Sequence, residues 1–223
     1  MPIYKYVNKD FFKKWTPEMA YVLGFFAADG YITVNRRGGQ FWSIQITDKI
    51  LLYKIRKVIN SEHKVSKRQG GVNEKTQYRL QIGNIEMCHD LRKLGFSERK
   101  TKSMSIPNIP SRYFTDFTRG YFDGDGNVWV GWIHKDQKTP SLTLKTMFTS
   151  CSGIFLRRLL VELTRFGLTG GSIYQSKGNY YRLQFSAKDS MKLYNFMYNH
   201  STQEGLFLSR KKITFERFKS LRL

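Results

Sequence analysis

Residues 21–30 read YVLGFFAADG, and residues 117–126 repeat this pattern as FTRGYFDGDG, 96 residues further along the chain. Two shorter matches follow in the same order, at spacings of 103 and 102 residues. They pair YRLQI at 78–82 with YRLQF at 181–185, and ITD at 46–48 with FTS at 148–150. Ordered matches at nearly one spacing indicate two homologous halves with small loop insertions.

Both halves predict the same elements. Thr16-Pro17-Glu18 predicts a helix start, because a hydroxyl caps a helix and proline suits its first turn. Ser111 opens the matching helix in the second half. Alternating apolar and polar residues predict strands, and apolar residues three and four apart predict helices between the strand pairs. Antiparallel hairpins with helices on one face describe an α+β fold.

Loops and boundaries follow from glycine and proline. We expect hairpin turns at residues 36–39, 69–71 and 178–179, where glycines cluster or Gly178 precedes Asn179. The segment Ile106-Pro107-Asn108-Ile109-Pro110 reads as a linker. We therefore place the N-terminal half at 1–105, the linker at 106–110, and the C-terminal half with a helical tail at 111–223.

The composition narrows the class of protein. The 223 residues carry 38 Lys and Arg against 17 Asp and Glu, a net charge of +21, which indicates a polyanionic partner such as nucleic acid. An aromatic share of 15% supplies ample apolar mass for a core, which excludes a disordered basic tail. Cys88 and Cys151 form no CxxC pair, which argues against a disulfide scaffold or zinc module. No secretory or membrane-spanning segment is evident, so we expect an intracellular protein located with DNA.

The predicted strands carry many Arg, Lys, Gln and Asn side chains on one face, with few balancing acids. A solvated sheet face is the ordinary explanation for any single strand. The recurrence over several strands favours contacts with base edges and phosphates, because these side chains make such contacts. The candidate DNA-binding residues are Thr33, Asn35, Arg37, Gln45, Lys67, Lys75, Gln77, Arg79, Gln81, Lys135, Lys145, Gln175, Lys177, Arg182 and Gln184.

The repeated motifs contain small residues four apart, Gly24 with Ala28 and Gly120 with Gly124. Because glycine costs a helix roughly 1 kcal/mol relative to alanine, a packing reason is needed. Two helices packed side by side through these residues supply it.

An Asp-Gly pair ends each motif, at Asp29-Gly30 and Asp125-Gly126. A turn is the ordinary reading of such a pair, with glycine as the helix terminator. A carboxylate is disfavoured at the negative end of a helix. If the two helices pack together, both carboxylates come close, and a divalent cation would stabilise them. All-oxygen ligation suits Mg²⁺. We therefore predict Asp29 and Asp125 as metal ligands.

The nine-residue stretches 22–30 and 118–126 resemble the paired motifs of the LAGLIDADG homing endonucleases, in the monomeric two-motif form. The resemblance extends to the strand pattern and to the segment 206–212, LFLSRKK. The first motif departs at its sixth position, where Ala27 replaces the usual acid that Asp123 retains. That acid is not the family's metal ligand.

The resemblance implies two pseudo-symmetric αββαββα halves that form a DNA-binding saddle. It implies Asp29 and Asp125 as catalytic, metal-binding residues, and sheet faces that read a long target in the major groove. It further implies double-strand cleavage across the minor groove with short 3′ overhangs. Metal ions shared with the scissile phosphates would supply the nucleophile and stabilise charge.

The resemblance also suggests catalytic helpers. Asp48 and Ser150 stand where the family often has Gln or Lys positioning water, and both depart in type. Lys188 resembles the basic residue near the family's cleavage centre. Its counterpart region in the first half, Asn84 and Ile85, is not basic. The two strands of the target are therefore expected to be cut at different rates.

Other functions remain open from the sequence. A DNA-binding regulator that has lost catalysis is disfavoured because both Asp29 and Asp125 are retained. An RNA maturase, with intron RNA as a partner, is permitted by the basic faces. An HNH nuclease is disfavoured because the histidines are scattered at 63, 89, 134 and 200. No splicing-type ends are evident, so we expect a free-standing enzyme.

Overall fold

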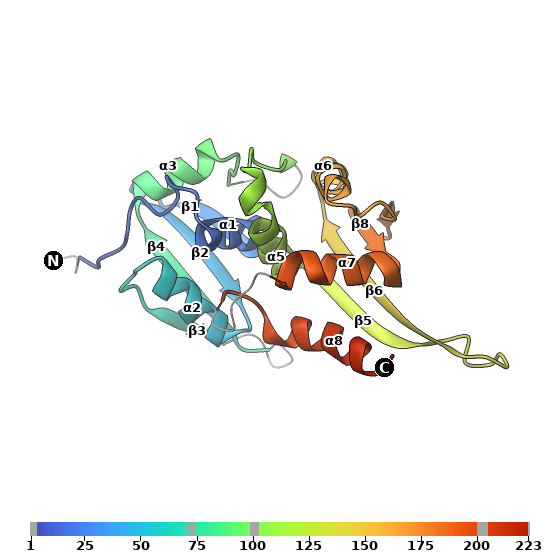
Figure 1. The fold of residues 1–223 in the computed structure, drawn as a ribbon. Coiled ribbons are helices and arrows are strands. Elements are labelled where there is room, and N and C mark those ends of the chain that lie inside the picture. The colour runs from blue at the N-terminus through green and yellow to red at the C-terminus, as the bar shows by residue number, and fades with distance from the viewer. Residues whose placement is uncertain (1–3, 70, 72–74, 99–102, 200–204, 223) are drawn as a thin grey trace. The chain divides into compact units, whose positions relative to one another are not determined.

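The structure, a computed structural model, describes residues 4–69, 71, 75–98, 103–199 and 205–222 (Figure 1). Two compact units make up the chain. The first comprises residues 1–100 and 107–121, and the second comprises residues 101–106 and 122–223. Each unit is described by itself below. The predicted turn at residues 69–71 and His200 fall partly or wholly outside the described residues.

In the first unit, the first motif helix runs directly into a four-stranded antiparallel sheet in the order β1-β2-β4-β3. Its elements are α1 (Pro17–Asp29), β1 (Gly30–Val34), β2 (Gln40–Ile46), α2 (Lys49–Val58), β3 (Val65–Arg68), β4 (Gln77–Gly83) and α3 (Ile85–Lys93). The 3₁₀ turn η1 (Ser111–Tyr113) leads into α5 (Phe114–Asp125), which starts in the first unit and ends in the second.

The second unit repeats this order around a four-stranded sheet, β5-β6-β8-β7. Its elements are β5 (Gly126–Ile133), β6 (Ser141–Ser150), α6 (Gly153–Arg165), β7 (Ser172–Ser176), β8 (Tyr180–Phe185), α7 (Ala187–Tyr198) and the additional α8 (Ser209–Ser220). The β5–β6 hairpin is longer than β1–β2, as Figure 1 shows. The predicted α+β class, with two halves of one topology, is confirmed.

Local sequence explains where these elements begin. The Thr16 hydroxyl accepts a hydrogen bond from the Met19 amide at 3.1 Å, so the predicted start of α1 is confirmed. The turn after β1 is also confirmed. Gly38 has a φ of +77°, a value that glycine adopts easily, and Asn35 Oδ1 accepts the amides of Arg37 and Gly39.

The strand register corrects one of the three sequence matches. Ile46 pairs with Tyr78, and Ser150 pairs with the equivalent Tyr181. The position equivalent to Asp48 is therefore Ser152, two residues beyond the Ser150 that sequence similarity had matched to it. Both residues cap a helix: Asp48 Oδ1 accepts the Leu51 amide at 2.9 Å, and Ser152 Oγ accepts the Phe155 amide at 3.2 Å.

Each sheet buries the face that its helices cover. In the first sheet this face carries Trp42 and Ile44, both fully buried. In the second sheet the position equivalent to Trp42 is Thr146, since each pairs with the last apolar residue of the neighbouring strand, Ile82 of β4 or Phe185 of β8. The two halves therefore share a topology and differ in core chemistry.

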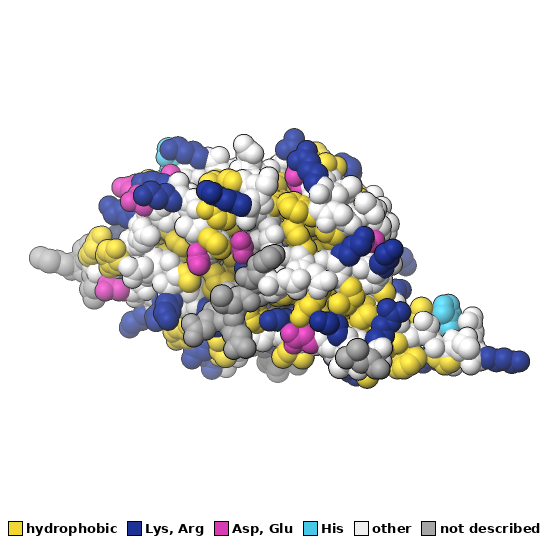
Figure 2. Space-filling model, viewed as in Figure 1, with side chains coloured by type: hydrophobic (Ala, Val, Ile, Leu, Met, Phe, Trp, Pro, Cys, Tyr) yellow, Lys and Arg dark blue, Asp and Glu magenta, His cyan; other side chains and the backbone are white. Residues whose placement is uncertain are grey.

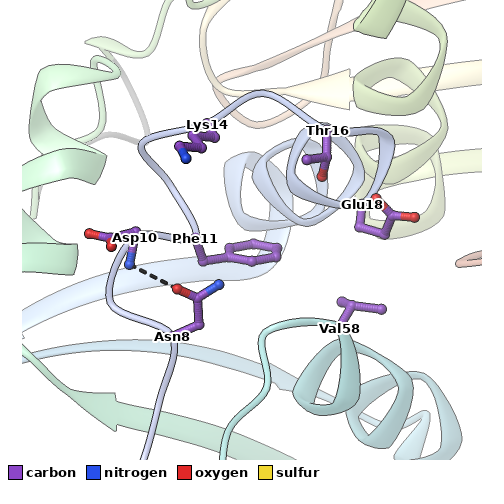
Figure 3. A pocket seen from close by; sticks show the side chains of 7 residues that line it. All are labelled: Asn8, Asp10, Phe11, Lys14, Thr16, Glu18 and Val58. Atoms are coloured by element: carbon purple, nitrogen blue, oxygen red, sulfur yellow. Dashed lines mark hydrogen bonds between the residues drawn. The ribbon is translucent and has the colours of Figure 1, made fainter.

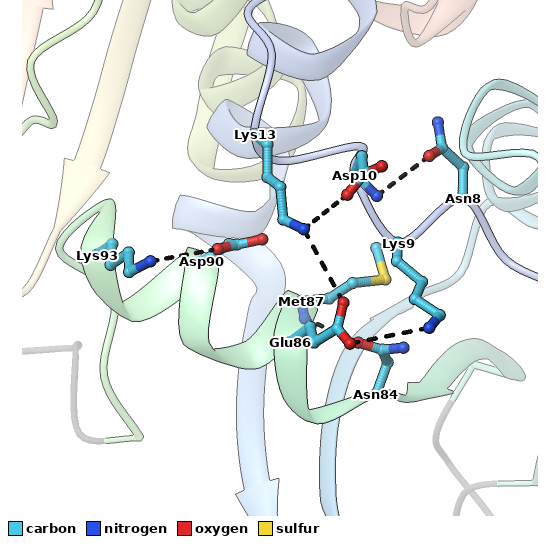
Figure 4. A network of polar contacts seen from close by, with 9 residues as sticks. All are labelled: Asn8, Lys9, Asp10, Lys13, Asn84, Glu86, Met87, Asp90 and Lys93. Atoms are coloured by element: carbon cyan, nitrogen blue, oxygen red, sulfur yellow. Dashed lines mark hydrogen bonds and ion pairs between the residues drawn. The ribbon is translucent and has the colours of Figure 1, made fainter.

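The segment before α1 is held against α3 by charged side chains (Figure 4). Lys13 contacts Asp10 at 2.6 Å and Glu86 at 3.9 Å, and Lys9 contacts Glu86 at 3.8 Å. The hydrogen bond from Lys13 lowers the pKa of Asp10. These groups are exposed, so the pairs orient the segment more than they stabilise the fold.

Candidate functional site

The two motif helices pack main chain against main chain. A Cβ on Gly24 would lie 2.0 Å from the Phe117 carbonyl oxygen, and a Cβ on Gly120 would lie 2.0 Å from that of Tyr21. Both contacts belong to the first unit, which includes residues 107–121. No side chain fits at either position. The predicted packing reason for both glycines is therefore present.

Asp29 is the last residue of α1, and Asp125 is the last residue of α5. Each follows its contact glycine by five residues, and each is half-buried. The next residue, Gly30 or Gly126, begins a strand. Each carboxylate therefore stands where a motif helix turns into the sheet.

Glycine is needed after each aspartate for a different reason from the predicted one, which was termination of the helix. Gly30 has a φ of −87°, which any residue adopts, so it is no left-handed helix terminator. Instead, a Cβ at Gly30 would lie 2.1 Å from the Phe26 ring, and one at Gly126 would lie 2.3 Å from the Phe122 ring. Packing of the motif phenylalanine against the helix end excludes a side chain there.

A single carboxylate at the end of each motif helix is the kind of ligand that a hard divalent cation uses. Among the described residues, no group of three or more His, Cys, Asp or Glu side chains could enclose a metal. Mg²⁺ commonly uses one or two protein carboxylates and completes its shell with water and phosphate oxygens. Asp29 and Asp125 each supply such a carboxylate at an accessible helix end.

The predicted helpers have defined positions. The Asp48 carboxylate caps α2. Ser150 is buried at the end of β6, where its hydroxyl accepts the Ser152 amide at 3.1 Å. Lys188 is exposed in the first turn of α7, while Asn84 caps α3 in the first half. Asp48 and Ser150 thus have structural roles at the end of a strand, and Lys188 points to solvent from a helix start.

The register sorts the predicted DNA-binding residues of the first sheet. Gln45, Arg79 and Gln81 lie opposite the buried face, because they alternate with Ile44, Leu80 and Ile82. Gln45 donates a hydrogen bond to Gln77 on the same face. Thr33 shares this face, while Asn35 and Arg37 lie in the exposed hairpin turn and Lys75 lies before β4.

The second sheet shows the same arrangement. Lys145, Arg182 and Gln184 lie opposite the face of Phe148 and Leu183. Lys135 lies in the loop between β5 and β6, and Lys177 lies in the β7–β8 turn. These outward positions follow the prediction, and their contacts with DNA stay predictions.

Two placements were wrong, both on edge strands. Lys67 pairs with Tyr78 and so shares the face of Leu80, not that of Arg79. Gln175 pairs with Tyr181 and so shares the face of Leu183, not that of Arg182. Each is exposed near the end of a short strand. Because polar residues occupy both faces there, alternation could not set the phase.

The arginines Arg79 and Arg182 occupy equivalent outward positions. The Nε atom of each is buried and has no hydrogen-bond partner among the described residues. The Arg182 guanidinium lies 5.3 Å from the Tyr180 ring. Both guanidinium groups are therefore held close to the sheet.

Sequence reasoning missed the outward residues Arg68 and Trp129. Arg68 pairs with Gln77 on the face of Arg79. Trp129 pairs with Lys145 and is 45% exposed, and its ring lies over Gly131, where a Cβ would be 2.3 Å away. Trp129 alternates with Val128 and Val130, so the strand pattern places it on the outward face. It was missed because an aromatic residue is expected in the core.

A cavity of about 590 Å³ lies near the start of α1 (Figure 3). Its lining is Asn8, Asp10, Phe11, Lys14, Thr16, Glu18 and Val58. Thr16 is already engaged as the helix cap. This cavity is at the opposite end of α1 from Asp29, roughly 18 Å away along a helix of 13 residues. It is therefore separate from the motif carboxylate.

Comparison with known proteins gives a family for the first half. Residues 16–94 match the family described as LAGLIDADG-like domain. These residues are a LAGLIDADG-like domain. The match contains the first LAGLIDADG motif with Asp29. The second motif lies outside it and is related to the first by the repeat.

The fold of LAGLIDADG endonucleases extends over nearly the whole chain. The meganuclease I-AabMI, in a structure bound to uncleaved DNA, is 17% identical with a TM-score of 0.61, covering 93% of this chain and 90% of that one. I-SmaMI, bound to uncleaved DNA with calcium ions, is 13% identical with a TM-score of 0.60 and the same coverage. Variants of the homing endonuclease I-DmoI are 16% identical with a TM-score of 0.58, covering 91% of this chain and 97% of theirs.

A sequence relative also carries a similar segment. The probable translation initiation factor IF-2 of Thermococcus kodakarensis is 32% identical over 170 residues, which cover 68% of this chain. The match spans 14% of that protein's length. The likeness therefore concerns a segment of the factor.

The LAGLIDADG fold here carries a strongly basic surface. Figure 2 shows many more Lys and Arg than Asp and Glu side chains on the visible face, in keeping with 38 against 17 in the chain. Within the described residues, no helix has the length and apolarity needed to cross a bilayer.

Proposed function

We propose that the protein is a site-specific DNA endonuclease that makes double-strand breaks with short 3′ overhangs in a long target. One observation carries the proposal: two motif helices meet through Gly24 and Gly120, and each ends five residues later in a carboxylate. The DNA-bound LAGLIDADG nucleases of the same fold support it.

Asp29 and Asp125 are the proposed metal ligands, with Mg²⁺ as the cofactor. A divalent cation bound there would activate water and stabilise the charge that develops on the phosphate. The two half-buried carboxylates place negative charge at the motif helix ends of a chain whose net charge is +21. Lys188 is the proposed basic helper. We retain Asp48 and Ser150 as candidates for positioning water, beside their structural roles.

The outward sheet faces are the proposed DNA-binding surfaces. Arg79, Gln81, Arg182 and Gln184 have the donors that bond base edges in the major groove. The lysines and arginines of the turns, among them Arg37, Lys135 and Lys177, suit phosphates. Lys67 and Gln175 face the other way and are proposed only as phosphate contacts from the strand ends.

The proposed form is a monomer with repeat halves at 1–105 and 111–223, joined by the linker at 106–110. It would act within the cell, where the DNA lies, and serve the homing of a mobile intron. An RNA-binding maturase role is not favoured, because the matching structures are DNA endonucleases.

The decisive experiment incubates the purified protein with a randomised duplex library and Mg²⁺, followed by sequencing of the cut ends. We expect cleavage at one long site with 3′ overhangs. Asp29→Asn and Asp125→Asn should each abolish double-strand cleavage while DNA affinity stays close to wild type. Full cleavage by both variants would reject the assignment of these carboxylates.

Salt dependence tests the phosphate contacts separately. Because lysines and arginines release counterions from DNA, affinity for the target should fall by about 10³–10⁵ between 50 and 200 mM salt if six to ten phosphates are contacted. A flat response in a fluorescence-anisotropy titration would exclude the proposed basic surface.

A further inference from the structure

Three side chains from neighbouring strands meet on the outward face of the second sheet. Met147 of β6 lies directly opposite Gln184 of β8, and Tyr174 comes from the adjacent edge strand β7, where it pairs with Arg182. The Tyr174 hydroxyl donates a hydrogen bond to Gln184 Oε1 at 3.1 Å and lies 3.7 Å from Met147 Sδ. The tyrosine therefore reaches across β8, and the three side chains form one cluster.

The cluster is accessible from solvent. Tyr174 is 40% exposed, and Met147 and Gln184 are half-buried. A partly exposed thioether leaves apolar surface in water, so packing that surface against an apolar group of a partner is favourable. The cluster thus presents an apolar surface directly beside a polar amide.

The tyrosine hydroxyl determines which group Gln184 offers to a partner. A glutamine amide has an oxygen that accepts hydrogen bonds and an NH₂ group that donates them. The hydroxyl has a single proton, and an amide oxygen is a better acceptor than a thioether sulfur, so the proton goes to Gln184. With its oxygen engaged in this way, Gln184 offers its NH₂ group. The cluster therefore combines a hydrogen-bond donor with an apolar surface.

One base matches that combination in the major groove. Thymine presents the acceptor O4 next to its C5-methyl group. Guanine presents acceptors without a methyl group, and adenine and cytosine each present an amino donor. We propose that Met147, Tyr174 and Gln184 form a thymine-reading site: the amide donates to O4, the thioether packs against the methyl group, and the tyrosine orients the amide. This inference rests on the DNA-binding function proposed above and names a base that the second half selects.

The first sheet holds serines at the positions equivalent to Met147 and Tyr174. Strand pairing identifies them as Ser43 and Ser66. Ser43 is fully buried, and the Ser66 hydroxyl donates to the main-chain carbonyl of Arg79 at 3.2 Å. Neither serine supplies the exposed apolar surface that a methyl group needs. We therefore expect the thymine in the part of the target that the second half contacts.

The first test measures the contact with the methyl group. A randomised duplex library is selected by binding in Ca²⁺, once with wild type and once with Met147→Ser, which carries the side chain of the equivalent position. We expect a thymine in the wild-type target where Met147→Ser relaxes the preference. Deoxyuridine at this position removes only the methyl group and should weaken wild-type binding about fourfold. Met147→Ser should bind both duplexes alike. Equal binding of both duplexes by wild type would overturn the proposal.

The second test measures the hydrogen bond to O4. At the same position, 5-methylcytosine keeps the methyl group and replaces O4 by an amino donor. Wild type should bind this duplex about tenfold more weakly than the thymine duplex. Gln184→Glu exchanges the NH₂ donor for an acceptor and should reverse the order. If Gln184→Glu kept the wild-type preference for thymine, the amide would not read O4 and the proposal would fail.

The third test separates orientation of the amide from a general structural role. Tyr174→Phe keeps the ring and removes the hydroxyl, so the amide can turn either group towards the base. Discrimination between thymine and 5-methylcytosine should then fall, while the loss caused by deoxyuridine stays at the wild-type value. Tyr180→Phe is the matched control, because the Tyr180 hydroxyl accepts from Arg182 at 3.4 Å. Discrimination by Tyr174→Phe equal to that of Tyr180→Phe would reject the orienting role.

The outcomes separate this proposal from the endonuclease function. If wild type selects a target by binding and does not cut it in Mg²⁺, the endonuclease function fails and the thymine site is still decided by the deoxyuridine duplex. If wild type cuts its target and deoxyuridine has no effect, only the thymine site fails. If Met147→Ser does not fold, deoxyuridine placed at each thymine of the target in turn decides, and unchanged wild-type binding at every position would overturn the proposal.

Discussion

The two sheets have the same strand order, yet one equivalent position holds Trp42 in the first and Thr146 in the second. Trp42 is fully buried among aromatic rings, with Phe12 and Phe26 at 5.4 and 6.2 Å. Thr146 is equally buried but belongs to a hydrogen-bonded cluster. The same sheet topology therefore accepts either an aromatic side chain or a hydrogen-bonded polar side chain at one core position.

The cluster in the second half centres on Ser190. Its hydroxyl accepts the Thr146 amide at 3.1 Å, contacts the Thr146 hydroxyl at 2.9 Å and donates to the Phe185 carbonyl at 3.1 Å. The Ser190 hydroxyl therefore bridges β6 and β8 at the end of their pairing, where Thr146 lies opposite Phe185. In the first half, the residue at the same place after the helix cap is Cys88, a buried thiol.

The largest effect should come from the feature that the halves share. Gly24→Ala and Gly120→Ala each place a Cβ 2.0 Å from a backbone oxygen, which neither helix can avoid without moving. Each should lower the free energy of unfolding by about 3 kcal/mol or more, measured by urea denaturation. Gly71→Ala is the control, since no described residue lies within 4 Å of where its Cβ would be. Clearly unequal losses of stability at Gly24 and Gly120 would contradict the view that the two motif helices share one equivalent contact.

The next effect should separate the two cores. Ser190→Ala leaves the buried Thr146 amide without its acceptor and should cost about 1–3 kcal/mol. Cys88→Ala removes one buried sulfur and should cost about 1 kcal/mol. Urea denaturation of both variants measures the difference. A larger loss from Cys88→Ala would show that the hydroxyl bridge is unimportant to the second core.

A third comparison concerns the arginines on the two sheets. Arg79→Ala and Arg182→Ala should each relax base preference within one half of the target, by about 1–3 kcal/mol at the affected base pair. Cleavage profiles on the randomised library would locate the change. A uniform loss over all sequences would instead identify these arginines as phosphate contacts.

The smallest effect compares the two cysteines. Burial raises the pKa of Cys88 from 9.0 to about 11, whereas Cys151 is exposed. Iodoacetamide at pH 8 should therefore modify Cys151 in the native protein and Cys88 only after unfolding. Mass spectrometry of the labelled peptides checks this. Rapid native labelling of Cys88 would show that the first half opens locally.

The same thiol gives a pH dependence. The folded state holds the Cys88 proton more tightly than the unfolded state does, so its contribution to stability is complete below pH 9 and is lost as the pH rises towards 11. Urea denaturation of Cys88→Ala should lack this decline. An identical decline in the variant would assign it to other groups.

The sequence predicted what depends on local chemistry. The cap at Thr16, the turn at Gly38 and the glycine contact of the motifs each rest on a residue type that suits one local geometry. The phase of β3 and β7 could not be predicted, because Lys67 and Gln175 sit on polar edge strands where either register satisfies the hydrophobic pattern.

The site was predicted in part, for similar reasons. Spacing within the motifs located the helix ends that carry Asp29 and Asp125. The equivalence of Asp48 with Ser152 was hidden, because short matches tolerate a shift of two residues that only strand pairing reveals. The Lys211 ammonium donates hydrogen bonds to the main-chain carbonyls of Phe122 and Gly126, which lie 89 and 85 residues earlier in the chain. No local sequence pattern predicts such a distant contact.

The helix contact is reciprocal: Gly24 faces Phe117 and Tyr121, while Gly120 faces Tyr21 and Phe25, at matching distances. A surface that complements its own copy is what a two-fold dimer of identical halves requires. Once such halves are joined in one gene, a substitution on one side no longer has to suit the other. Covalent linkage thus preserves the shared contact while freeing each half to evolve its own core.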